Sequence, residues 1–423
     1  MSDASPVPAY AAYWRHWRCA VAVWQAGSAA RAAPRCFATP SSVARAVQQL
    51  EARLQLVLFE RRARGMVVTP TGARILPRVA RAFAYLAQAD HDLQTLRPAG
   101  AGLGSSLSLG YRHWQVLLAV AQHGSETLAA KLLGVSQPAV HQALAQLEQS
   151  LQCRLFERTA RGMRQTAAGS RFERGVRLAL AEFRQAQEDH DWQRGLRHAR
   201  LVIGALPLSS GSLVPHAVEA LLRRFPALCI TVLDGTYDTL LQGLRRAEVD
   251  LIVGALREPP PGPDVRQETW FIDTLAVLAR RDHPALQRPR VSLADLVDHA
   301  WVTPLPATPA RRAFDQAFRA AGCRAPVESL VSNSPAVIRA SLLDSDRLAL
   351  VPPALMAREL ALGLVQPVAV PVPGTERPIG MTLRVDQQPS AALLALLALL
   401  RQSDDGDPAR SGQPGRVSGD LHD

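Results

Sequence analysis

Cysteine is scarce in this sequence, and its few residues do not form a motif. Five cysteines are spread over 423 residues, with no Cys-x-x-Cys pair and no histidine at zinc-ligand spacing. This pattern excludes a disulfide-stapled secreted fold and predicts a reduced protein. Single thiols in apolar strings, such as Cys229 between Leu228 and Ile230, are expected to be buried.

Catalytic motifs are missing as well. The sequence has no Gly-x-Ser-x-Gly elbow, no His-Glu-x-x-His pair, no phosphate-binding loop and no paired metal ligands. Three C-terminal histidines, His216, His283 and His299, stand isolated. We therefore expect no enzymatic activity, no cofactor and no bound metal.

No stretch is long and apolar enough to predict a membrane span. The longest apolar run, Ala391 to Leu400, is shorter than the roughly 20 residues a transmembrane helix needs, and it predicts a closing amphipathic helix. Met1 to Trp17 lacks the basic and apolar regions of a secretory signal. We expect a cytoplasmic protein with no membrane partner.

What the sequence does contain is an internal repeat, displaced by about 97 residues. Nearly half of roughly 59 aligned positions are identical and no gap is needed. The matched segments include His16-Trp17 with His113-Trp114, Gln49-Leu50-Glu51 with Gln146-Leu147-Glu148, Leu58 to Arg61 with Leu155 to Arg158, and Thr69, Gly72 and Arg74 with Thr166, Gly169 and Arg171. One module has therefore been duplicated in tandem.

The net charge of +11 lies in the duplicated half. Residues 1–197 hold 25 basic and 13 acidic side chains, whereas residues 198–423 hold 23 and 24. Lys131 is the only lysine, which we attribute to genome composition, so only the sign of the charge is informative. A basic half beside a near-neutral half predicts a polyanion-binding part joined to a part with another task.

The second copy has the pattern of a helix-turn-helix. Ser125 can cap a first helix that Gly134 ends, and Ser136 can cap a second helix that has Pro138 in its first turn. One face of this second helix is apolar, with Val140, Leu144, Leu147 and Leu151. Its outward face, which could contact base edges in the major groove, carries Gln137, His141, Gln142 and Gln146.

After this helix, four arginines surround Leu155-Phe156 and Gly162, as in a short β-hairpin wing that contacts the DNA backbone. They are Arg154, Arg158, Arg161 and Arg164. Leu155 and Phe156 themselves are expected in the core, and Thr166 is expected to cap a long helix. The alternative, that the polar residues merely coat a solvated helix, stays open for each residue taken alone.

These segments resemble the LysR-type transcriptional regulators. The family pattern is matched by Gly124-Ser125, Ala129-Ala130, Ser136 to Val140, Leu147-Glu148, Leu155 to Arg158 and Thr166 to Gly169. The resemblance implies a winged helix-turn-helix, a dimerising linker helix and a C-terminal effector domain shaped like periplasmic binding proteins. Its implied partners are double-stranded DNA and a small-molecule effector, in a homodimer or homotetramer that could also contact RNA polymerase.

Three features depart from the family pattern. His141 replaces the usual serine of the recognition helix, Gln152 replaces a glycine, and the module is present twice. In the first copy, Pro34 lies inside the helix before the recognition helix, where a proline costs around 3 kcal/mol. The first copy is therefore either a DNA-contacting module or one with a structural or dimerising role. The candidate DNA-binding residues are Thr39, Ser41 and Arg45 in the first copy, and Ser136, Gln137, Pro138, His141, Gln142, Arg158 and Arg161 in the second.

From about residue 200 onward, short apolar runs alternate with helical segments. Strands are predicted at Leu201 to Leu206, Cys229 to Leu233 and Asp250 to Leu256, with helices between them. We expect a parallel, helix-covered sheet, a single further strand at Phe271 to Ala279, and a second α/β unit from about Ala300 to Leu350.

The expected fold is therefore multidomain: two all-α winged helix-turn-helix domains followed by an α/β two-lobed, periplasmic-binding-protein-like (type 2) effector domain. The expected divisions are a first helix-turn-helix with its linker helix at 1–97, a flexible linker at 98–109, the second helix-turn-helix at 110–197, the effector-binding domain at 198–402 and a disordered tail at 403–423.

The loop after the first strand of the effector domain is the candidate effector site. Pro207 to Ser212 opens a helix whose N-terminal N–H groups could attract a carboxylate-bearing effector, although such residues are also ordinary turn and cap residues. The resemblance favours effector contact at Pro207, Leu208, Ser209 and Ser210, faced from the other lobe by Thr303, Ser332 and Asn333. Leu233 to Asp238 could line the same cleft or cap the next helix. The alternative function is a solute-binding protein of the same two-lobed fold.

Overall fold

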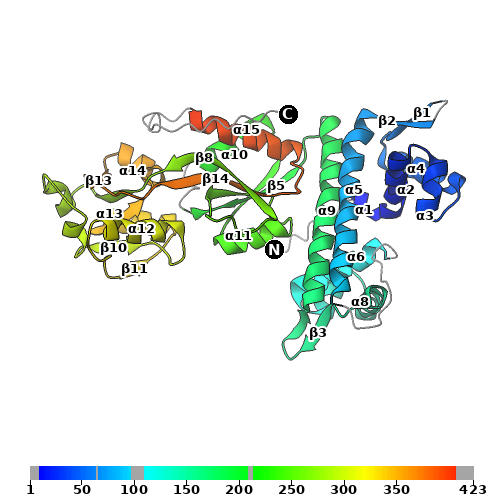
Figure 1. Ribbon diagram of the computed structural model, residues 1–423, viewed down its shortest axis with the longest axis horizontal. Helices are drawn as coiled ribbons and strands as arrows, with labels where there is room; N and C mark the ends of the chain where they lie inside the picture. Colours follow the sequence, from blue (N-terminus) through cyan, green and yellow to red (C-terminus); the bar gives the residue numbers. More distant parts are fainter. Residues whose placement is uncertain (1–8, 63–64, 97–108, 208–212, 406–423) are drawn as a thin grey trace. The chain divides into compact units, whose positions relative to one another are not determined.

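The computed structural model describes residues 9–62, 65–96, 109–207 and 213–405 (Figure 1). The chain divides into two compact units, Met1–His198 and Ala199–Asp423. All of the expected linker at 98–109 except its last residue lies outside the described residues, as does most of the expected tail. That tail does not begin at 403, because the last helix, α15, runs from Ala391 to Asp405.

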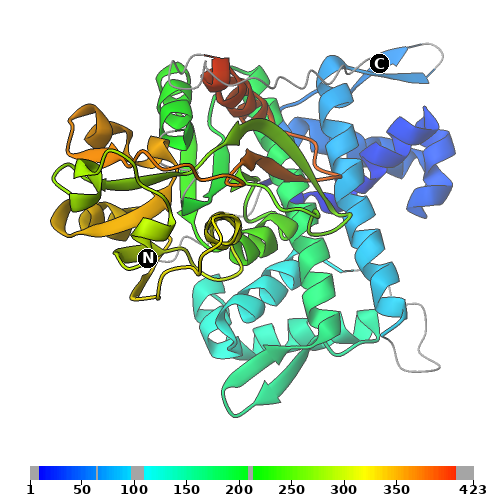
Figure 2. The same cartoon turned by 60° about the vertical axis from the view of Figure 1, so that its left-hand side comes forward.

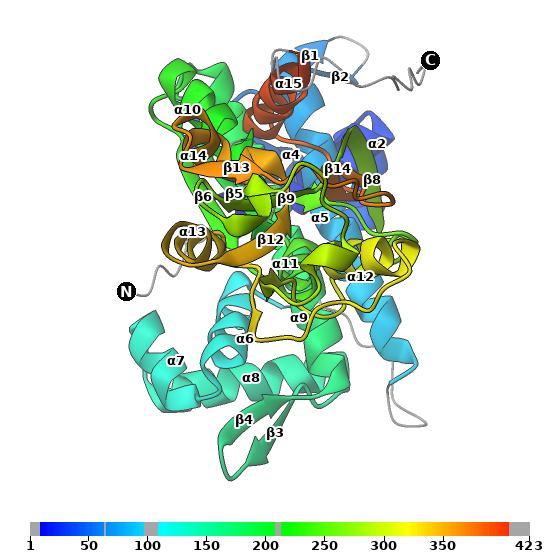
Figure 3. The ribbon, with the colours of Figure 1, turned by 90° about the vertical axis from the view of Figure 1, so that its left-hand side faces the viewer.

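The first unit contains two copies of one module. After a short helix α1 (Ala9–Ala12), the first copy consists of α2 (Trp14–Ala26), α3 (Ala29–Cys36), α4 (Pro40–Leu54), β1 (Phe59–Arg62) and β2 (Gly65–Val68). The second copy, shown in Figure 3, consists of α6 (Tyr111–His123), α7 (Glu126–Leu133), α8 (Gln137–Leu151), β3 (Phe156–Thr159) and β4 (Gly162–Gln165). Every boundary in the second copy lies 97 residues after its counterpart, which confirms the tandem repeat.

In each copy, an equivalent glutamate closes the turn between the recognition helix and the wing. Glu51 Oε1 accepts a hydrogen bond from the Leu58 backbone N–H at 2.7 Å, and Glu148 Oε1 accepts one from the Leu155 N–H at 2.7 Å. Each carboxylate therefore joins the end of a recognition helix to the start of a wing and satisfies a donor that would otherwise be unpaired. The Leu-Glu and Leu-Phe pairs of the sequence repeat reflect this contact.

The first copy is as completely folded as the second. Helix α3 forms although Pro34 lies within it, and the Ser28 hydroxyl caps it by accepting from the Arg31 N–H at 3.3 Å. The turn that follows places Phe37 in the left-handed region, with φ 51°, where the second copy has Gly134. The proline has not removed the recognition helix.

A glycine ends the matched motif of each copy because the wing passes close to it. Thr166 begins α9 (Ala167–Gln193): its hydroxyl accepts from the Gly169 N–H at 3.0 Å and donates to the Arg154 carbonyl at 2.7 Å. A Cβ added at Gly169 would lie 2.1 Å from the Leu155 carbonyl oxygen. Only glycine fits there without moving the wing.

Replacing Gly169 by alanine is expected to destabilise the first unit by about 1–3 kcal/mol, because the new methyl group meets backbone rather than a movable side chain. Thermal unfolding of the full chain measures the effect. Gly110→Ala is the matched control, since its Cβ would have no heavy atom closer than 3.7 Å. Equal melting temperatures for the two variants would contradict the close approach.

The two long helices of the first unit pack side by side, as Figures 1 and 2 show. They are α5 (Pro70–Gln94) and α9, and they run antiparallel. Arg78, near the start of α5, reaches Asp189 near the end of α9, while Arg171, near the start of α9, donates to the Asp92 carbonyl at 3.5 Å.

Helix α1 is held on α9 by a tyrosine–histidine contact. Tyr10 Oη lies 2.8 Å from His190 Nδ1 in a buried setting. Burial lowers the pKa of His190, although the neighbouring Asp191 raises it. The folded protein therefore favours the neutral imidazole.

The lowered pKa of His190 predicts acid sensitivity. The unfolded chain, with a histidine pKa of about 6.5, binds the proton more readily than the folded chain. The contribution of His190 to stability is therefore complete above roughly pH 6.5 and is lost as the pH falls from there through the folded pKa. The range from about pH 7.5 to about pH 5.5 roughly spans that window. Across it, we expect the melting temperature to drop more in the parent protein than in His190→Gln. A drop of the same size in both would exclude this histidine as the cause.

The second unit contains two five-stranded sheets, with the orders β6-β5-β7-β14-β8 and β11-β10-β12-β9-β13. The strands of the first sheet are β5 (Arg200–Ala205), β6 (Cys229–Asp234), β7 (Leu251–Ala255), β8 (Val265–Asp273) and β14 (Arg377–Arg384). Those of the second are β9 (Ala276–Arg280), β10 (Ala300–Thr303), β11 (Leu330–Val331), β12 (Arg347–Val351) and β13 (Val365–Pro367). Besides α15, the α-helices described in this unit are α10 (Leu213–Arg224), α11 (Tyr237–Arg245), α12 (Pro309–Ala320), α13 (Pro335–Asp344) and α14 (Ala357–Ala361).

The structure corrects three expectations for this unit. The sheets are mixed rather than parallel. In the first, β14 returns from the far end of the chain and pairs antiparallel with both β7 and β8, and in the second, β9 pairs antiparallel with β12 and β13. The single strand expected at Phe271 to Ala279 is two strands, since β8 ends at Asp273 and β9 begins at Ala276 in the other sheet. Cys229 is exposed rather than buried, because β6 is an edge strand.

Among the residues that the structure describes, no helix combines the length and apolarity needed to cross a bilayer. Within the same ranges, no group of three or more histidine, cysteine or acidic side chains is arranged to hold a metal ion.

Candidate nucleic-acid interface

The recognition helix of the second copy is α8. Ser136 caps it by accepting from the Ala139 N–H at 3.4 Å, and Pro138 lies in its first turn. The apolar face is buried as expected, through Val140, Leu144, Leu147 and Leu151. The residues expected on the outward face are all exposed: Gln137, His141, Gln142 and Gln146.

The wing is a two-stranded antiparallel hairpin in which Phe156 pairs with Gln165 and Thr159 with Gly162. Leu155 and Phe156 are buried, as expected. The four arginines around them are exposed: Arg154, Arg158, Arg161 and Arg164. The hairpin thus presents cations beside the outward face of α8.

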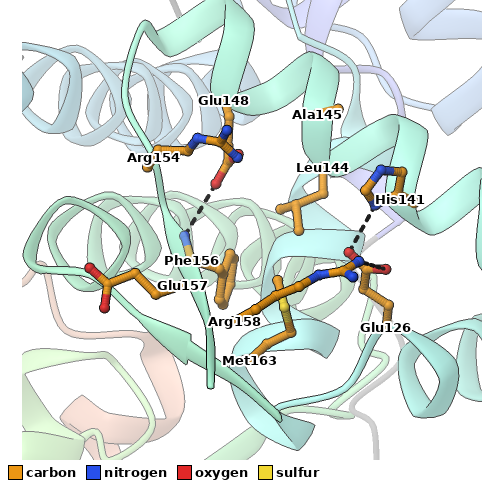
Figure 4. A pocket seen from close by; sticks show the side chains of 10 residues that line it. All are labelled: Glu126, His141, Leu144, Ala145, Glu148, Arg154, Phe156, Glu157, Arg158 and Met163. Atoms are coloured by element: carbon orange, nitrogen blue, oxygen red, sulfur yellow. Dashed lines mark hydrogen bonds and ion pairs between the residues drawn. The ribbon is translucent and has the colours of Figure 1, made fainter. Parts of the chain in front are cut away.

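Sequence reasoning missed Glu126, the carboxylate that organises this surface (Figure 4). Glu126 is the first residue of α7, and its side chain is only 7% exposed. It accepts from Gln137 Nε2 at 3.0 Å, lies 3.1 Å from His141 Nδ1 and forms an ion pair of 3.6 Å with Arg158 Nη2. Three of the candidate DNA-binding side chains therefore converge on one nearly buried carboxylate.

A comparison of the two copies carries the signal that could have revealed this cluster. Three members, Glu126, Gln137 and His141, differ from their counterparts in the first copy, which are Ala29, Pro40 and Ala44. The three positions differ together between the two copies, and in the second copy their side chains meet at Glu126, so they form one local hydrogen-bond network.

The candidate residues of the first copy occupy equivalent places on α4. Thr39 caps the helix by accepting from the Ser42 N–H at 3.2 Å, as Ser136 does in the second copy. Ser41 and Arg45 are exposed. The first copy therefore presents an outward polar face of its own, with different side chains.

The candidate effector residues of the second lobe are brought together by neighbouring parallel strands. Thr303 ends β10, and its carbonyl accepts from the Ser332 N–H at 2.9 Å. The Thr303 side chain is fully buried and donates to the Leu330 carbonyl at 3.2 Å. Asn333 Oδ1 accepts from the Leu305 N–H at 3.0 Å. Both side chains thus hold the loops at this edge.

In the first lobe, Pro207 is half-buried just after β5. The remaining candidates, Leu208, Ser209 and Ser210, lie outside the described residues. The segment from Leu233 to Asp238 supplies a helix cap, because the Thr236 hydroxyl accepts from the Thr239 N–H at 3.3 Å at the start of α11.

A second residue missed from the sequence is Arg257, which follows β7. Its guanidinium stacks on the Tyr237 ring at 4.2 Å from the centroid, and its Nη1 atom is buried without a hydrogen-bond partner in the described parts of the chain. Burial lowers the pKa of Arg257, and Arg312 on α12 lowers it further, against the opposing effects of Tyr237 and Asp238. A half-buried cation with a buried, unsatisfied donor atom is suited to an anionic ligand.

A duplicated winged helix-turn-helix joined to a two-lobed α/β unit defines a DNA-binding regulator with a ligand-binding domain. Residues 14–73 and 111–170 each match the bacterial regulatory helix-turn-helix of the lysR family, and residues 194–405 match the LysR substrate binding domain. The chain belongs to the LysR family of transcriptional regulators, which are not enzymes.

Known members of the family match most of the chain. The transcriptional regulator GalR of Pseudomonas putida is 35% identical over 386 residues, which cover 91% of this chain and 96% of GalR. PcaQ of Agrobacterium fabrum is 29% identical over 294 residues, which cover 69% of this chain and 94% of PcaQ. A full-length OxyR variant of Pseudomonas aeruginosa shares the fold, with a TM-score of 0.50, 22% identity, and coverage of 68% of this chain and 96% of OxyR.

The extent of these matches bears on the duplication. An alignment over 386 of 423 residues must include most of both copies of the module, whereas an alignment over 294 residues has room for one. The similarity to GalR therefore extends over most of both copies of the module.

Proposed function

We propose that this protein controls transcription by binding promoter DNA through α8 and the wing of its second copy, and that a small anionic effector bound by the two-lobed unit changes this binding. The carrying observation is the exposed polar face on which Glu126 orients Gln137 and His141 beside Arg158. We further propose the functional divisions 1–97, 110–197 and 198–402 for the two helix-turn-helix modules and the effector-binding part.

Each candidate DNA-binding residue of the second copy has a distinct role in this proposal. Gln137, His141 and Gln142 would contact base edges, because amide and imidazole groups pair with them in the major groove. Arg158 and Arg161 would contact phosphates and set the affinity for any duplex. Ser136 and Pro138 shape the first turn of α8, whose free N–H groups favour a phosphate.

A gel shift with the full chain and the DNA upstream of its own gene tests this function. We expect sequence-selective binding that weakens steeply between about 50 and 200 mM salt, as for proteins that contact several phosphates. Equal affinity for an unrelated duplex of the same length would contradict it. A solute-binding protein of the same two-lobed fold would bind a small acid and show no selective DNA binding.

Arg257 is the observation that favours an anionic effector. A ligand carboxylate beside its unpartnered Nη1 atom would form a charge-assisted hydrogen bond, which contributes about 1.5–3 kcal/mol. A panel of small carboxylic acids and their amides, assayed by thermal shift, identifies the ligand, and only the acids should stabilise the protein.

Replacing Arg257 by glutamine is expected to raise the effector concentration for a half-maximal response by about 10- to 100-fold, because the variant loses the cation but keeps a polar side chain. The measurement is the effector-dependent change in DNA affinity. Arg223→Gln, at an exposed position of α10, is the matched control and should respond like the parent. An unchanged response in Arg257→Gln would remove this residue from the site.

We also propose that chains associate through the effector unit. Strand β6 is at the edge of its sheet, and Val232 and Leu233 are exposed on it. An exposed apolar edge strand is a surface that pairs readily with a second copy.

A further inference from the structure

The contact between α5 and α9 buries a carboxylate, Glu182, whose cations come from α5 and have no charged counterparts on α9. Arg78 is 1% exposed; its Nε donates to Asp189 Oδ2 at 2.5 Å and its Nη1 to Gln185 Oε1 at 2.9 Å. Glu182, 2% exposed, lies 3.7 Å from Arg78 Nη1 and 3.1 Å from Arg81 Nε. Two arginines of α5 therefore neutralise one buried carboxylate of α9.

The other end of the same contact requires a small residue. A Cβ added at Gly175 of α9 would lie 2.5 Å from the Ala89 Cβ and 3.2 Å from the Tyr85 carbonyl oxygen. The helices therefore approach more closely here than a side chain on α9 would allow.

The two ends of the α5–α9 contact are formed by equivalent positions of the repeat, which now carry different residues. A shift of 97 residues carries Arg78 onto Gly175, Arg81 onto Leu178 and Tyr85 onto Glu182. Arg78 faces Glu182 at one end, and Gly175 faces Tyr85 at the other. The pair thus has an approximate two-fold relation with unlike residues on its two sides.

Pairing of identical helices from two chains would lose this match. In an α9–α9 pair with the same geometry, each Glu182 would face Gly175 and Leu178 and would lack a cation. In an α5–α5 pair, each Arg78 would keep counterparts of Asp189 and Gln185, namely Asp92 and Gln88, but would face Tyr85 instead of Glu182. A buried carboxylate without its cations is strongly destabilising, so the side chains disfavour the α9–α9 pair. Only the mixed pair places both arginines beside Glu182.

We propose that a single chain is a complete pair of unlike DNA-binding modules, joined by α5 and α9, and that its target is a two-part site without palindromic symmetry. The proposal rests on the proposed DNA-binding function and extends it by assigning the first copy to DNA. Association between chains would then use other surfaces and would add modules two at a time.

The geometry of the helix pair suits such a target. Helices of 25 and 27 residues are roughly 40 Å long at 1.5 Å per residue, and each follows directly after its wing. Because they are antiparallel, their N-terminal ends lie at opposite ends of the pair. Half-sites one helical turn of DNA apart are separated by about 34 Å.

The side chains on the two recognition helices differ in their expected base preference. Arg45 of α4 and Gln142 of α8 occupy the same position of the repeat, and both are exposed. Arginine pairs preferentially with guanine and glutamine with adenine. We therefore expect different sequences in the two half-sites.

Photo-cross-linking of the full chain tests the helix pairing without DNA. Phe83 packs edge-on against Phe183 with ring centroids 5.9 Å apart, so Phe83→p-benzoylphenylalanine places the probe in the contact. We expect a product with the mass of one chain, cross-linked to an α9 peptide. A product with twice that mass, or no bond to α9, would overturn the pairing.

Two further variants keep this test decisive. Tyr85→p-benzoylphenylalanine supplies a second probe beside Gly175, in case the first variant folds poorly. Phe37→p-benzoylphenylalanine is the control, since Phe37 is 93% exposed on the first copy and should give no bond to α9.

Footprinting with single substitutions tests the two unlike half-sites. We expect Arg45→Ala to weaken protection about tenfold at one half-site and Gln142→Ala to weaken it similarly at the other. Equal weakening of both half-sites by each variant would overturn the proposal. Absence of any selective footprint would reject DNA binding altogether, whereas the cross-link would still decide the helix pairing.

Discussion

Arg78→Met is expected to lower the free energy of unfolding of the first unit by about 3–5 kcal/mol, the cost of breaking a buried ion pair from one side. Methionine fills similar space but leaves Asp189 without its 2.5 Å partner and Glu182 with one cation instead of two. Urea unfolding of the full chain, followed by the tryptophans of the first unit, measures the loss.

Arg81→Met is the matched control for this result. Arg81 keeps 25% of its side chain in contact with solvent, and its removal leaves Arg78 beside Glu182. We expect a loss of about 1 kcal/mol or less, as for partly exposed ion pairs. If both variants unfolded at the same urea concentration as the parent, the buried network would not stabilise the α5–α9 contact.

The second large effect concerns DNA. Gln137→Ala and His141→Ala are expected to reduce the preference for the cognate site over unrelated DNA by about 1–3 kcal/mol each, because they remove contacts to base edges. Arg158→Ala is expected to weaken binding to every duplex and to lower the salt slope by about one, because it removes a phosphate contact. Affinities measured for both duplexes across a salt series separate these outcomes.

Glu126→Gln is a further test of this assignment. The amide keeps the shape of Glu126 while removing the charge that pairs with Arg158. A negative charge beside the phosphates opposes binding, so the variant should bind unrelated DNA more tightly while its selectivity falls. Full selectivity in both recognition-helix variants would place sequence recognition elsewhere on the protein.

The sequence was most informative where the structure is local. The repeat, the caps at Ser136 and Thr166, and the buried face of α8 were all predicted, because each depends on residues within a few turns of one another. The same local reasoning was wrong for the sheets. Strand β14 lies more than a hundred residues from its partner β7, and nothing near either strand indicates an antiparallel neighbour.

The candidate sites show the same division. The exposed positions of Gln137 and His141 follow from helical spacing, but their common partner Glu126 belongs to a different helix. No sequence pattern marks Arg257 as a functional residue, because a lone arginine after a strand is ordinary. Its importance comes from the burial of an atom that finds no partner in the described structure.

The sequence by itself determined that this protein has two helix-turn-helix modules, a basic N-terminal half and a two-lobed C-terminal unit. It did so because capping, helical spacing and charge are properties of short segments. Only the tertiary structure decided that α5 pairs with α9 of the same chain. That choice depends on Arg78 and Arg81 meeting Glu182, which lies about a hundred residues away, and such a match of buried charges is visible only once the chain has folded.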